Sequence, residues 1–429
     1  MTQAIDSETG RQALRALLRE RSLLGPLEVL YARVGRWFQV PLPSFHPYIT
    51  GGPEANRKLL VTDSNKLLWR NPDPVTEVLR RGVLVTDGEE HDHDRSLMEP
   101  DLHPSVLVHY MGTMLAQTER VTSTWQDGEV VDMLVEGRKI ALLIVMQTLF
   151  GVDAWGDLPT IWEPLLKTIE YISPGPWILW RRFPRVGFKR HRQVLDDYLY
   201  HIIRSRRDSR GHMDLLQHLL DARLDDDRIR DQMLTMLIAG HDTSTALLAW
   251  AFYLLGLHPD ILADLTQQLD QALGKQPPPA VPGWQPPLLD HVIKETLRLY
   301  PPIHIGSRVV GQAVDFGGHA AAPGERILYS IYLTHRDPEY WENAETFCPD
   351  RFASGRKTPP FAYVPFGGGT RACIGAAFGQ AEARLVLARL LQTYSFELVD
   401  ASVRAHMGAT LEPRPGVFLR VRKRRELQP

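Results

Sequence analysis

The stretch from Asp227 to Gly256 constrains the fold more than any other feature of the sequence. Its apolar residues recur at three- and four-residue spacing with almost no interruption, which predicts one continuous α-helix. At 1.5 Å per residue this helix is roughly 45 Å long. A rod of that length can cross a whole domain, so the sequence favours a large body built mainly from helices.

Similar helical periodicity covers much of the remaining sequence. Strand patterns are few and short, at residues 44–50, 306–310, 324–330 and 417–423. The proline-rich segment 274–287 excludes regular structure and is predicted to be a surface connection between helices. The predicted fold class is therefore mainly α with a minor β region. The further predicted helices span residues 11–22, 54–61, 92–99, 105–126, 136–150, 189–207, 212–222, 259–273, 287–299 and 376–392.

Composition excludes several classes of protein. The 429 residues carry a net charge of -2, so no basic excess favours nucleic acid as a partner. Cys348 and Cys373 are too few for a disulfide framework, and the N-terminal residues lack the apolar core of a signal peptide, so we expect a cytoplasmic protein. The longest uncharged apolar stretches, 140–152 and 246–257, are shorter than the roughly 18 to 20 residues of a membrane span. No transmembrane segment is predicted, and peripheral membrane contact stays open.

One cysteine lies in an unusual setting, the glycine-rich loop FGGGTRACIG at residues 366–375. A helical pattern begins directly after Cys373, so exposed backbone N–H groups and the helix dipole would favour its thiolate. The glycines let a flat ligand approach the backbone, and Arg371 offers a cation for a carboxylate. A planar, iron-centred ligand with two carboxylates fits. The alternatives are a buried structural cysteine, a zinc site that lacks ligands at suitable spacing, and a nucleophile that lacks a local signature.

This loop resembles the haem-binding motif F-G-x-G-x-R-x-C-x-G of the cytochrome P450s, the haem-thiolate monooxygenases. The resemblance implies that Cys373 is the axial iron ligand of haem b, with a thiolate that favours O–O cleavage. It implies one catalytic domain over residues 1–429, with about 1–20 loosely ordered, folded as a triangular prism around haem held between the long helix and the cysteine-loop helix. Cys348 has no such setting and is predicted to be structural. The matching positions are Phe366, Gly367, Gly369, Arg371, Cys373 and Gly375.

The long helix contains a second motif, AGHDTS at residues 239–244. Ala239 and Gly240 lie four and three residues before Thr243, which places small side chains and a hydroxyl on one face. Taken alone, Gly240 would serve tight helix packing and Thr243 would bond back to a carbonyl. The motif is similar to the oxygen-activation sequence of the cytochrome P450s. That resemblance implies haem contacts for Ala239 and Gly240, catalytic roles for Asp242 and Thr243, and dioxygen as co-substrate.

Glu295 and Arg298 lie three residues apart on one predicted helix, and such a pair is usually a surface ion pair of about 0.2 to 0.5 kcal/mol. Here FCPDRF follows at residues 347–352, and its Arg351 resembles the third member of the family's Glu-Arg-Arg network. The implied role is a buried network that fixes the loop presenting Cys373.

His91 and Arg95 are four residues apart, so both project from one helical face, which by default is a solvated polar face. The family resemblance implies instead that they contact haem propionates together with Arg308 and Arg371, since arginines match carboxylates in charge and geometry. His93 lies off that face and is predicted to be on the surface.

The resemblance also implies where substrate binds. The positions that it indicates are nearly all apolar, so a hydrophobic small molecule such as a terpene, fatty acid or steroid is expected. His304 is the main polar candidate, with a surface position as its alternative. The predicted substrate contacts are Val83, Val85, Leu237, Ile238, Ile303, His304, Ile305 and Ala409.

Residues 171–192 fall where the family has a mobile entrance lid. An amphipathic lid is one interpretation. The other is a lid resting on a membrane, with apolar side chains in the lipid and arginines at its phosphates. The residues of this second interpretation are Trp177, Ile178, Trp180, Arg181, Arg182 and Arg185.

No flavin or ferredoxin module follows the last strand pattern, so NAD(P)H electrons are expected from a separate ferredoxin or flavodoxin with its reductase. Such a carrier would dock on the cysteine side, where Arg356, Lys357 and Arg384 are candidates for contact. Two other functions stay open at this point. One is a haem-thiolate peroxygenase or isomerase, and the other is a haem-binding sensor or carrier without turnover.

Overall fold

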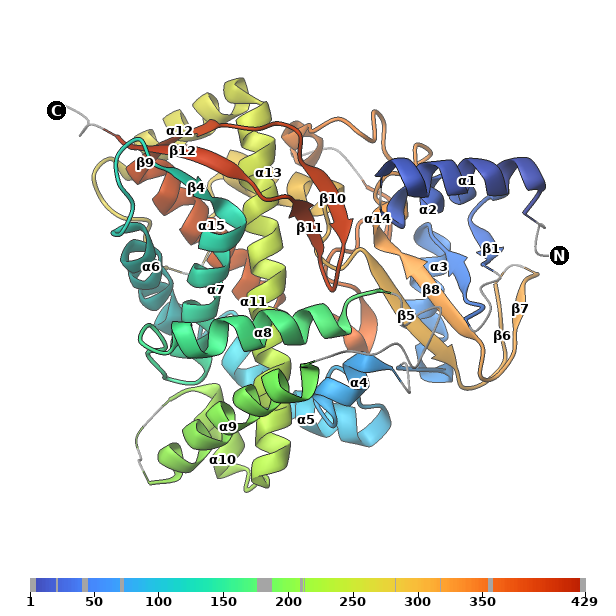
Figure 1. Cartoon of the computed structure of the whole chain (residues 1–429), viewed down its shortest axis with the longest axis horizontal. Coiled ribbons are helices and arrows are strands. Elements are labelled where there is room, and N and C mark those ends of the chain that lie inside the picture. Colours follow the sequence, from blue (N-terminus) through green and yellow to red (C-terminus); the bar gives the residue numbers. More distant parts are fainter. Residues whose placement is uncertain are drawn as a thin grey trace.

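The long helix predicted from the sequence forms the axis of the molecule. In a computed structural model, α11 (Asp226–Leu257) runs along most of the height of the view, and the other helices pack around it (Figure 1). The carboxylate of Asp225 caps this helix by accepting a hydrogen bond from the N–H of Arg228 at 2.7 Å. The structure describes residues 5–20, 22–40, 45–69, 73–175, 187–208, 211, 213–281, 283–316, 318–353 and 358–424.

Most predicted helices are present. Helices α12 and α13 begin and end at the predicted residues, and α11 exceeds its prediction by one residue at each end. Helices α2, α4, α8 and α14 were not predicted. Helix α1 covers part of the predicted N-terminal segment and packs on α2. The remaining helices are α1 (Ser7–Glu20), α2 (Leu24–Val34), α3 (Pro53–Arg57), α4 (Pro74–Leu79), α5 (Gly88–Leu102), α6 (Val108–Thr122), α7 (Met133–Leu149), α8 (Leu158–Ile172), α9 (Phe188–Arg207), α10 (Leu215–Asp221), α12 (Pro259–Leu273), α13 (Pro287–Leu299), α14 (Ile331–Thr334) and α15 (Ala376–Thr393).

The β structure is limited to small sheets, so the chain has the predicted mainly α fold. In the five-stranded sheet the order is β1-β2-β8-β5-β3, with β2 parallel to β8 and the other pairs antiparallel. Strands β4, β12 and β9 form a second sheet, and β10–β11 and β6–β7 form separate pairs. Strands β2, β5, β8 and β12 were predicted. The strands are β1 (Trp37–Gln39), β2 (Tyr48–Thr50), β3 (Leu67–Leu68), β4 (Val130–Asp132), β5 (Ile305–Val310), β6 (Val314–Asp315), β7 (Ala320–Ala321), β8 (Arg326–Ser330), β9 (Tyr394–Leu398), β10 (Arg404–Met407), β11 (Leu411–Arg414) and β12 (Phe418–Lys423).

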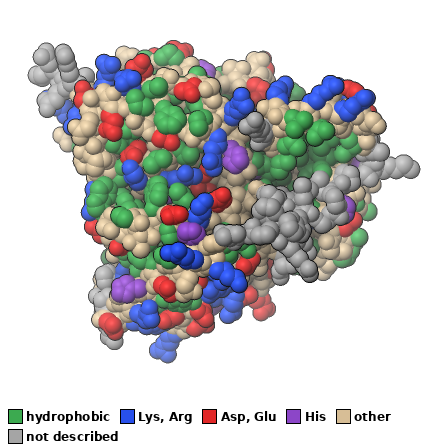
Figure 2. Space-filling view, in the orientation of Figure 1, with side chains coloured by type: hydrophobic (Ala, Val, Ile, Leu, Met, Phe, Trp, Pro, Cys, Tyr) green, Lys and Arg blue, Asp and Glu red, His purple; other side chains and the backbone are tan. Residues whose placement is uncertain are grey.

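A hydrophobic core cluster extends from Val75 to Val421 and contains most of α7 and α11, which pack against each other. The apolar stretches 140–152 and 246–257 therefore supply core rather than a membrane span. Within the described ranges no single helix has the length and apolarity to cross a bilayer, and α11 with α12 meets that test only as a pair bent by 111°. On the face shown in Figure 2, acidic and basic side chains are mixed, in line with the small net charge.

Candidate active site

The long helix α11 is buried along its middle except at one point. From Arg228 to Leu255 every residue is buried apart from Ala239, which is exposed, and Gly240 and Thr243, which are half-buried. Because neighbours on both sides of these residues in the sequence lie in the core, accessible surface here indicates an interior hollow. The structure thus places predicted contact residues of α11 beside space that a ligand can fill.

The cysteine loop reaches the start of α15 through a tight backbone path. Gly367 and Gly369 have φ values of 68° and 65°, and a Cβ atom on Gly369 would lie 2.0 Å from the carbonyl oxygen of Leu60. The N–H of Cys373 donates to the carbonyl oxygen of Phe366 at 2.9 Å, which closes the loop. Cys373 keeps accessible surface although protein surrounds it closely enough to desolvate its thiol, so its sulfur faces an interior space rather than bulk water.

The surroundings of Cys373 act in opposite directions on the protonation of its thiol. Burial raises the pKa of the thiol, while the backbone N–H of Gly375 and the charge of Arg95 only partly oppose that effect. A cation bound at the sulfur, such as an iron ion, would favour the thiolate and so add to the effects of Gly375 and Arg95.

The four residues predicted to bind propionates lie in one cationic cluster. Burial and the nearby charges of Arg308 and Arg95 lower the pKa of Arg371, against the raising effect of Asp87. Burial likewise lowers the pKa of His91, with Arg371 and Arg95 adding to the effect. Cations this close repel one another, so two carboxylates bound among them would be stabilised.

Two residues of this cluster were missed from the sequence. Asp87 pairs with Arg371 at 2.6 Å and also accepts a hydrogen bond from the backbone N–H of Trp69. The Trp69 ring lies under the guanidinium carbons of Arg308, at 5.1 Å, and Arg371, at 5.8 Å. Arg95 instead donates to the carbonyl oxygen of Ala372 at 2.8 Å, beside the cysteine. Neither Trp69 nor Asp87 belongs to a pattern that reveals it without the fold.

Three consecutive polar residues of α11 point to three different partners. The Thr243 hydroxyl donates to the carbonyl oxygen of Ala239 at 2.6 Å. The carboxylate of Asp242 accepts from the Thr410 hydroxyl at 2.8 Å, and burial, with Glu412, raises the pKa of Asp242 to about 6. Thr243 thus keeps accessible surface at the hollow, whereas the neighbouring Asp242 turns its carboxylate to the β10–β11 hairpin.

Glu382 is a further ionisable residue that the sequence did not reveal. The hydroxyl of Ser244 donates to Oε2 of Glu382 at 2.6 Å, and this contact ties α11 to α15 nine residues after Cys373. Glu382 is fully buried, and burial raises its pKa to about 8, so the carboxyl group is mainly protonated at neutral pH.

Gly240 keeps some accessible surface beside Ala239 and Thr243, while its missing Cβ would point toward α7. A Cβ atom at this position would lie 2.8 Å from Cγ2 of Val145 on α7. Adjacent residues of a helix are about 100° apart, so Gly240 turns toward α7 while Ala239 and Thr243, one turn apart, share a face. Its small size serves the packing of α7 on α11.

The predicted Glu-Arg-Arg network is present as a set of direct contacts. Glu295 and Arg298 are both fully buried, with Nε of Arg298 2.8 Å from Oε2 of Glu295. Oε1 accepts from Nε of Arg351 at 3.3 Å and from the backbone N–H of Cys348 at 3.0 Å. Arg298 also donates to carbonyl oxygens of the segment before the cysteine loop, including Thr346 at 3.2 Å.

The predicted substrate contacts divide into two groups. Val85, Ile305 and Ala409 are half-buried and Ile303 is exposed, whereas Val83 and Ile238 are nearly covered. Leu237 has 1% of its surface accessible and His304 3%, so neither faces an open hollow. His304 is therefore neither a surface residue nor a polar group on the open face of the site, and burial lowers its pKa to about 4.

Residues of α11 hold the loop that carries Val83 and Val85. Oε1 of Gln232 accepts from the N–H of Val83 at 2.8 Å, and Oδ2 of Asp231 accepts from the N–H of Arg81 at 3.1 Å. The sequence placed Asp231 and Gln232 on the long helix and gave no sign of this role. Because both side chains are buried, these hydrogen bonds fix the loop against the helix.

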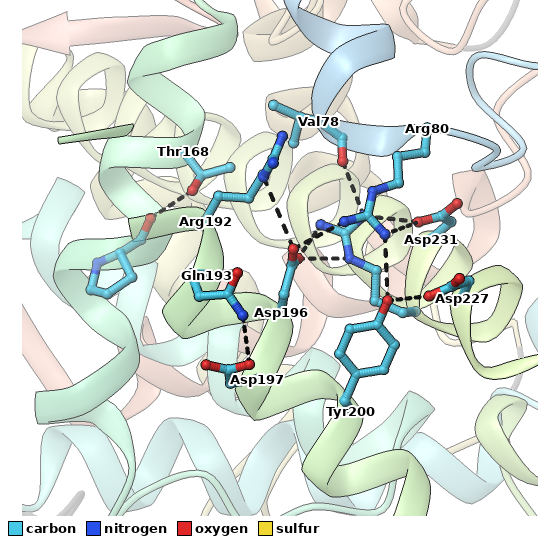
Figure 3. Close-up of polar contacts among 12 residues, drawn as sticks. Val78, Arg80, Thr168, Arg192, Gln193, Asp196, Asp197, Tyr200, Asp227 and Asp231 are labelled. Carbon is cyan, nitrogen blue, oxygen red and sulfur yellow. Dashed lines mark hydrogen bonds and ion pairs between the residues drawn. The ribbon is translucent and has the colours of Figure 1, made fainter. Parts of the chain in front are cut away.

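An ion network extends this attachment to α9 (Figure 3). Asp196 of α9 accepts from Arg80 at 3.1 Å and from Nε of Arg230 at 2.8 Å. Arg230 is fully buried and also bonds Asp231 at 2.9 Å. Tyr200 of α9 adds a hydrogen bond to Asp227. Helices α4, α9 and α11 are thus joined beside the loop.

Several predictions concern residues outside the described part of the chain. They are the membrane-facing residues Trp177, Ile178, Trp180, Arg181, Arg182 and Arg185, and the docking residues Arg356 and Lys357. The remaining docking candidate, Arg384, is largely buried and lies 3.6 Å from Asp290, so it does not present a free cation to a carrier.

The comparison with known proteins agrees with this geometry. A family model described as Cytochrome P450 matches residues 27–419. The chain belongs to the cytochrome P450 family. Pentalenene oxygenase from Streptomyces avermitilis is 31% identical to this cytochrome P450 over 389 residues, which cover 85% of each chain. Cyclooctatin synthase from Streptomyces melanosporofaciens is 29% identical over 399 residues, covering 87% of this chain and 84% of the relative.

Solved structures show the same fold. The retinoic acid-bound cyanobacterial CYP120A1 superimposes with a TM-score of 0.83 and 26% identity, covering 92% of this chain and 93% of the other. This cytochrome P450 is accordingly a monooxygenase that uses haem and dioxygen. The residues of the site fit haem. The sulfur of Cys373 can bind the iron, the hollow beside Ala239 can hold the ring, and the cation cluster can bind the two carboxylates.

Proposed function

We propose that this cytochrome P450 inserts one oxygen atom of dioxygen into a hydrophobic small molecule of the terpene class, with electrons from a separate carrier, and that residues 1–429 form one catalytic domain. The observation that carries the proposal is that α11 is buried on both sides of Ala239 and Thr243 but keeps accessible surface at these two residues. Asp242, which accepts a hydrogen bond from the Thr410 hydroxyl, lies beside Thr243 in the sequence. A site that only carried haem would not need these polar groups.

Haem, when bound, supplies the oxygen activation and the electron transfer of this family. Cys373 would hold its iron, and His91, Arg95, Arg308 and Arg371 would hold its carboxylates. The hydroxyl of Thr243 donates to the carbonyl oxygen of Ala239 and, after turning from it, would offer a hydrogen bond to dioxygen.

The proposed proton donors are two buried carboxyl groups, those of Asp242 and Glu382. Asp242 holds a proton below a pKa of about 6, and Glu382 holds one below about 8, so around neutral pH one is mainly charged and the other mainly neutral. Ser244 and Thr410 each donate a hydrogen bond to one of these groups. Each group can therefore accept and release a proton within the buried surroundings of α11, where Asp242 and Ser244, the partner of Glu382, lie on either side of Thr243 in the sequence.

The substrate class rests on the apolar side chains of Val85, Ile303 and Ile305 and on the relatives. The names of two relatives refer to pentalenene and to cyclooctat-9-en-7-ol, which are polycyclic terpenes. A fixed, apolar loop beside a rigid helix suits such a rigid hydrocarbon, because little conformational entropy is lost on binding. A ferredoxin or flavodoxin with its reductase is the proposed electron source.

The test begins with reduced, carbon monoxide-treated protein, which should give the absorption of sulfur-ligated haem in the wild type and lose it in Cys373→Ser. Polycyclic terpenes, fatty acids and steroids are then screened for a high-spin shift. With a surrogate ferredoxin system, product should form together with consumption of dioxygen and NADPH. Product without dioxygen consumption would indicate an isomerase or peroxygenase, and ligand binding without product from any shifted ligand would indicate a carrier.

A further inference from the structure

The carboxylate of Asp242 points away from the hollow, toward the β10–β11 hairpin. Its Oδ2 accepts a hydrogen bond from the Thr410 hydroxyl at 2.8 Å, and both residues are 2% exposed. Among the described residues, Oδ1 of Asp242 has no hydrogen-bond partner. The orientation of this acid therefore depends on one hydroxyl, 168 positions away in the sequence.

The turn that carries Thr410 is held firmly on three sides. The N–H of Ala409 donates to the Ser173 hydroxyl at the end of α8, at 2.9 Å. Leu411 follows Thr410, and its carbonyl oxygen accepts from the indole N–H of Trp250 on α11 at 2.7 Å. The backbone N–H of Leu411 donates to the carbonyl oxygen of Pro302 at 2.9 Å. The Thr410 hydroxyl is thus placed by backbone contacts that do not involve Asp242.

The charged and titratable groups around Asp242 act in opposite directions. Burial has the largest effect on its pKa, and Glu412 of β11 adds to it, whereas Thr410 and Arg138 of α7 lower the pKa. Arg138 and Glu412 form a buried ion pair with each other. The neighbouring His241 is buried, with its pKa lowered to about 3, so it is neutral near pH 7. Of these groups, Thr410 donates a hydrogen bond directly to Asp242.

We propose that Thr410 is a positioning residue for proton transfer by Asp242: its hydroxyl donates to Oδ2 and leaves Oδ1 as the oxygen that gains and releases the proton. This rests on the proposed monooxygenase function and deepens it. The proton taken up by Oδ1 is released again in each cycle, so Asp242 ends unchanged. Ala409, next to Thr410, borders the proposed substrate space, so the same turn joins substrate binding to the acid.

The experiment follows the protonation of Asp242 in the full-length, haem-loaded protein by infrared spectroscopy. The band of its protonated carboxyl group is assigned by its loss in Asp242→Asn, and its pH midpoint is compared between wild type, Thr410→Val and Thr410→Ser. Loss of the hydroxyl should shift the midpoint upward by about one pH unit. The serine variant, which keeps the hydroxyl, should return toward the wild-type midpoint.

Thr245→Val is the matched control, because Thr245 is buried on the same helix and its hydroxyl donates to the carbonyl oxygen of His241, at 2.7 Å, and not to Asp242. It should leave the midpoint unchanged. Thr410→Ala serves the same comparison if the valine variant does not fold. An unchanged midpoint in the variants without the hydroxyl, or an equal shift in Thr245→Val, would overturn the proposal.

A second measurement, the fraction of consumed NADPH that yields product, distinguishes failure of this proposal from failure of the proposed function. Introduced into the wild-type protein, Thr410→Val should lower coupling and enlarge the solvent isotope effect on product formation. Introduced into Asp242→Asn, it should change neither quantity further. If Asp242→Asn itself keeps full coupling, the proton role of Asp242 in the proposed function fails, and so does the catalytic part of this proposal, whatever the infrared midpoint shows. A loss of coupling by Thr410→Val that persists in the Asp242→Asn background would show that Thr410 does not act through Asp242.

Discussion

Substitution of Glu295 by glutamine should destabilise the protein far more than the same change at a surface ion pair. Glutamine keeps the size of the side chain, removes its charge and turns an amide donor toward guanidinium donors. Glu295 and Arg298 are both 0% exposed, and Glu295 accepts four hydrogen bonds, from Arg298 twice, Arg351 and the N–H of Cys348.

The expected loss of stability follows from the buried charge of Arg298 that the substitution leaves without its partner. Arg298 keeps its bonds to the carbonyl oxygens of His335, at 2.8 Å, and Ala344, at 2.7 Å, but its charge has no counter-ion beside it. Breaking a buried pair by removing one partner costs about 3–5 kcal/mol. Arg351, with its side chain 10% exposed, loses the same partner and adds to the loss.

The chain offers a control with the same helical spacing. Lys167 and Glu170 are also three residues apart, at 2.8 Å, but their side chains are 50% and 69% exposed. Glu170→Gln should therefore cost less than about 1 kcal/mol. Comparing the two substitutions separates the effect of burial from the effect of sequence spacing.

The assay is urea unfolding of the haem-loaded protein, followed by tryptophan fluorescence, since Trp341 lies 5.2 Å from the guanidinium carbon of Arg298. The ferrous carbon monoxide spectrum is recorded in parallel. Glu295→Gln should lower the unfolding midpoint and weaken the spectrum, and the double variant Glu295→Leu with Arg298→Met should lose less stability than the sum of its single variants. A midpoint for Glu295→Gln equal to that of Glu170→Gln would refute the reasoning.

Three further predictions concern the site. Burial raises the folded-state pKa of Glu382 to about 8, above its unfolded value, so the free energy of unfolding should fall as the pH rises toward about 8. Glu382→Gln should remove this contribution to the pH dependence, measured by urea unfolding at pH 5, 7 and 9. Gln232→Leu, which frees the N–H of Val83, should weaken binding of a ligand that gives a high-spin shift by about tenfold in a spectral titration, with the shift itself retained. Thr243→Ala should raise peroxide release per NADPH while the ferrous carbon monoxide spectrum stays intact, and unchanged coupling would remove Thr243 from the mechanism.

The sequence predicted the elements that are stable through their own periodicity. Helices α11, α12 and α13 carry long apolar patterns, and proline begins α12 and α13. Helix α8 was missed because Pro164 within it reads as a helix breaker. Strands such as β10, with the sequence RAHM, have no alternating pattern and depend on pairing with β11.

The candidate site was predictable where a motif lies within one segment, and not where two segments meet. The cysteine loop and the Ala239–Thr243 face follow from local sequence. Glu382, Asp87 and Thr410 are single polar residues of ordinary kinds, and their partners are brought to them by the packing of helices and by the hairpin. Only the fold distinguishes them from surface residues.

The tripeptide Asp242-Thr243-Ser244 shows how one helix can serve three neighbours. Successive side chains are about 100° apart, so they leave α11 toward the hairpin, the hollow and α15 in turn. Two carboxyl groups, Asp242 and Glu382, therefore lie on different sides of this segment of α11, and their pKa values are about 6 and about 8, each raised by burial. Because each holds its proton over a different pH range, the pH dependence of coupling in Asp242→Asn and in Glu382→Gln should identify which of them delivers protons at a given pH.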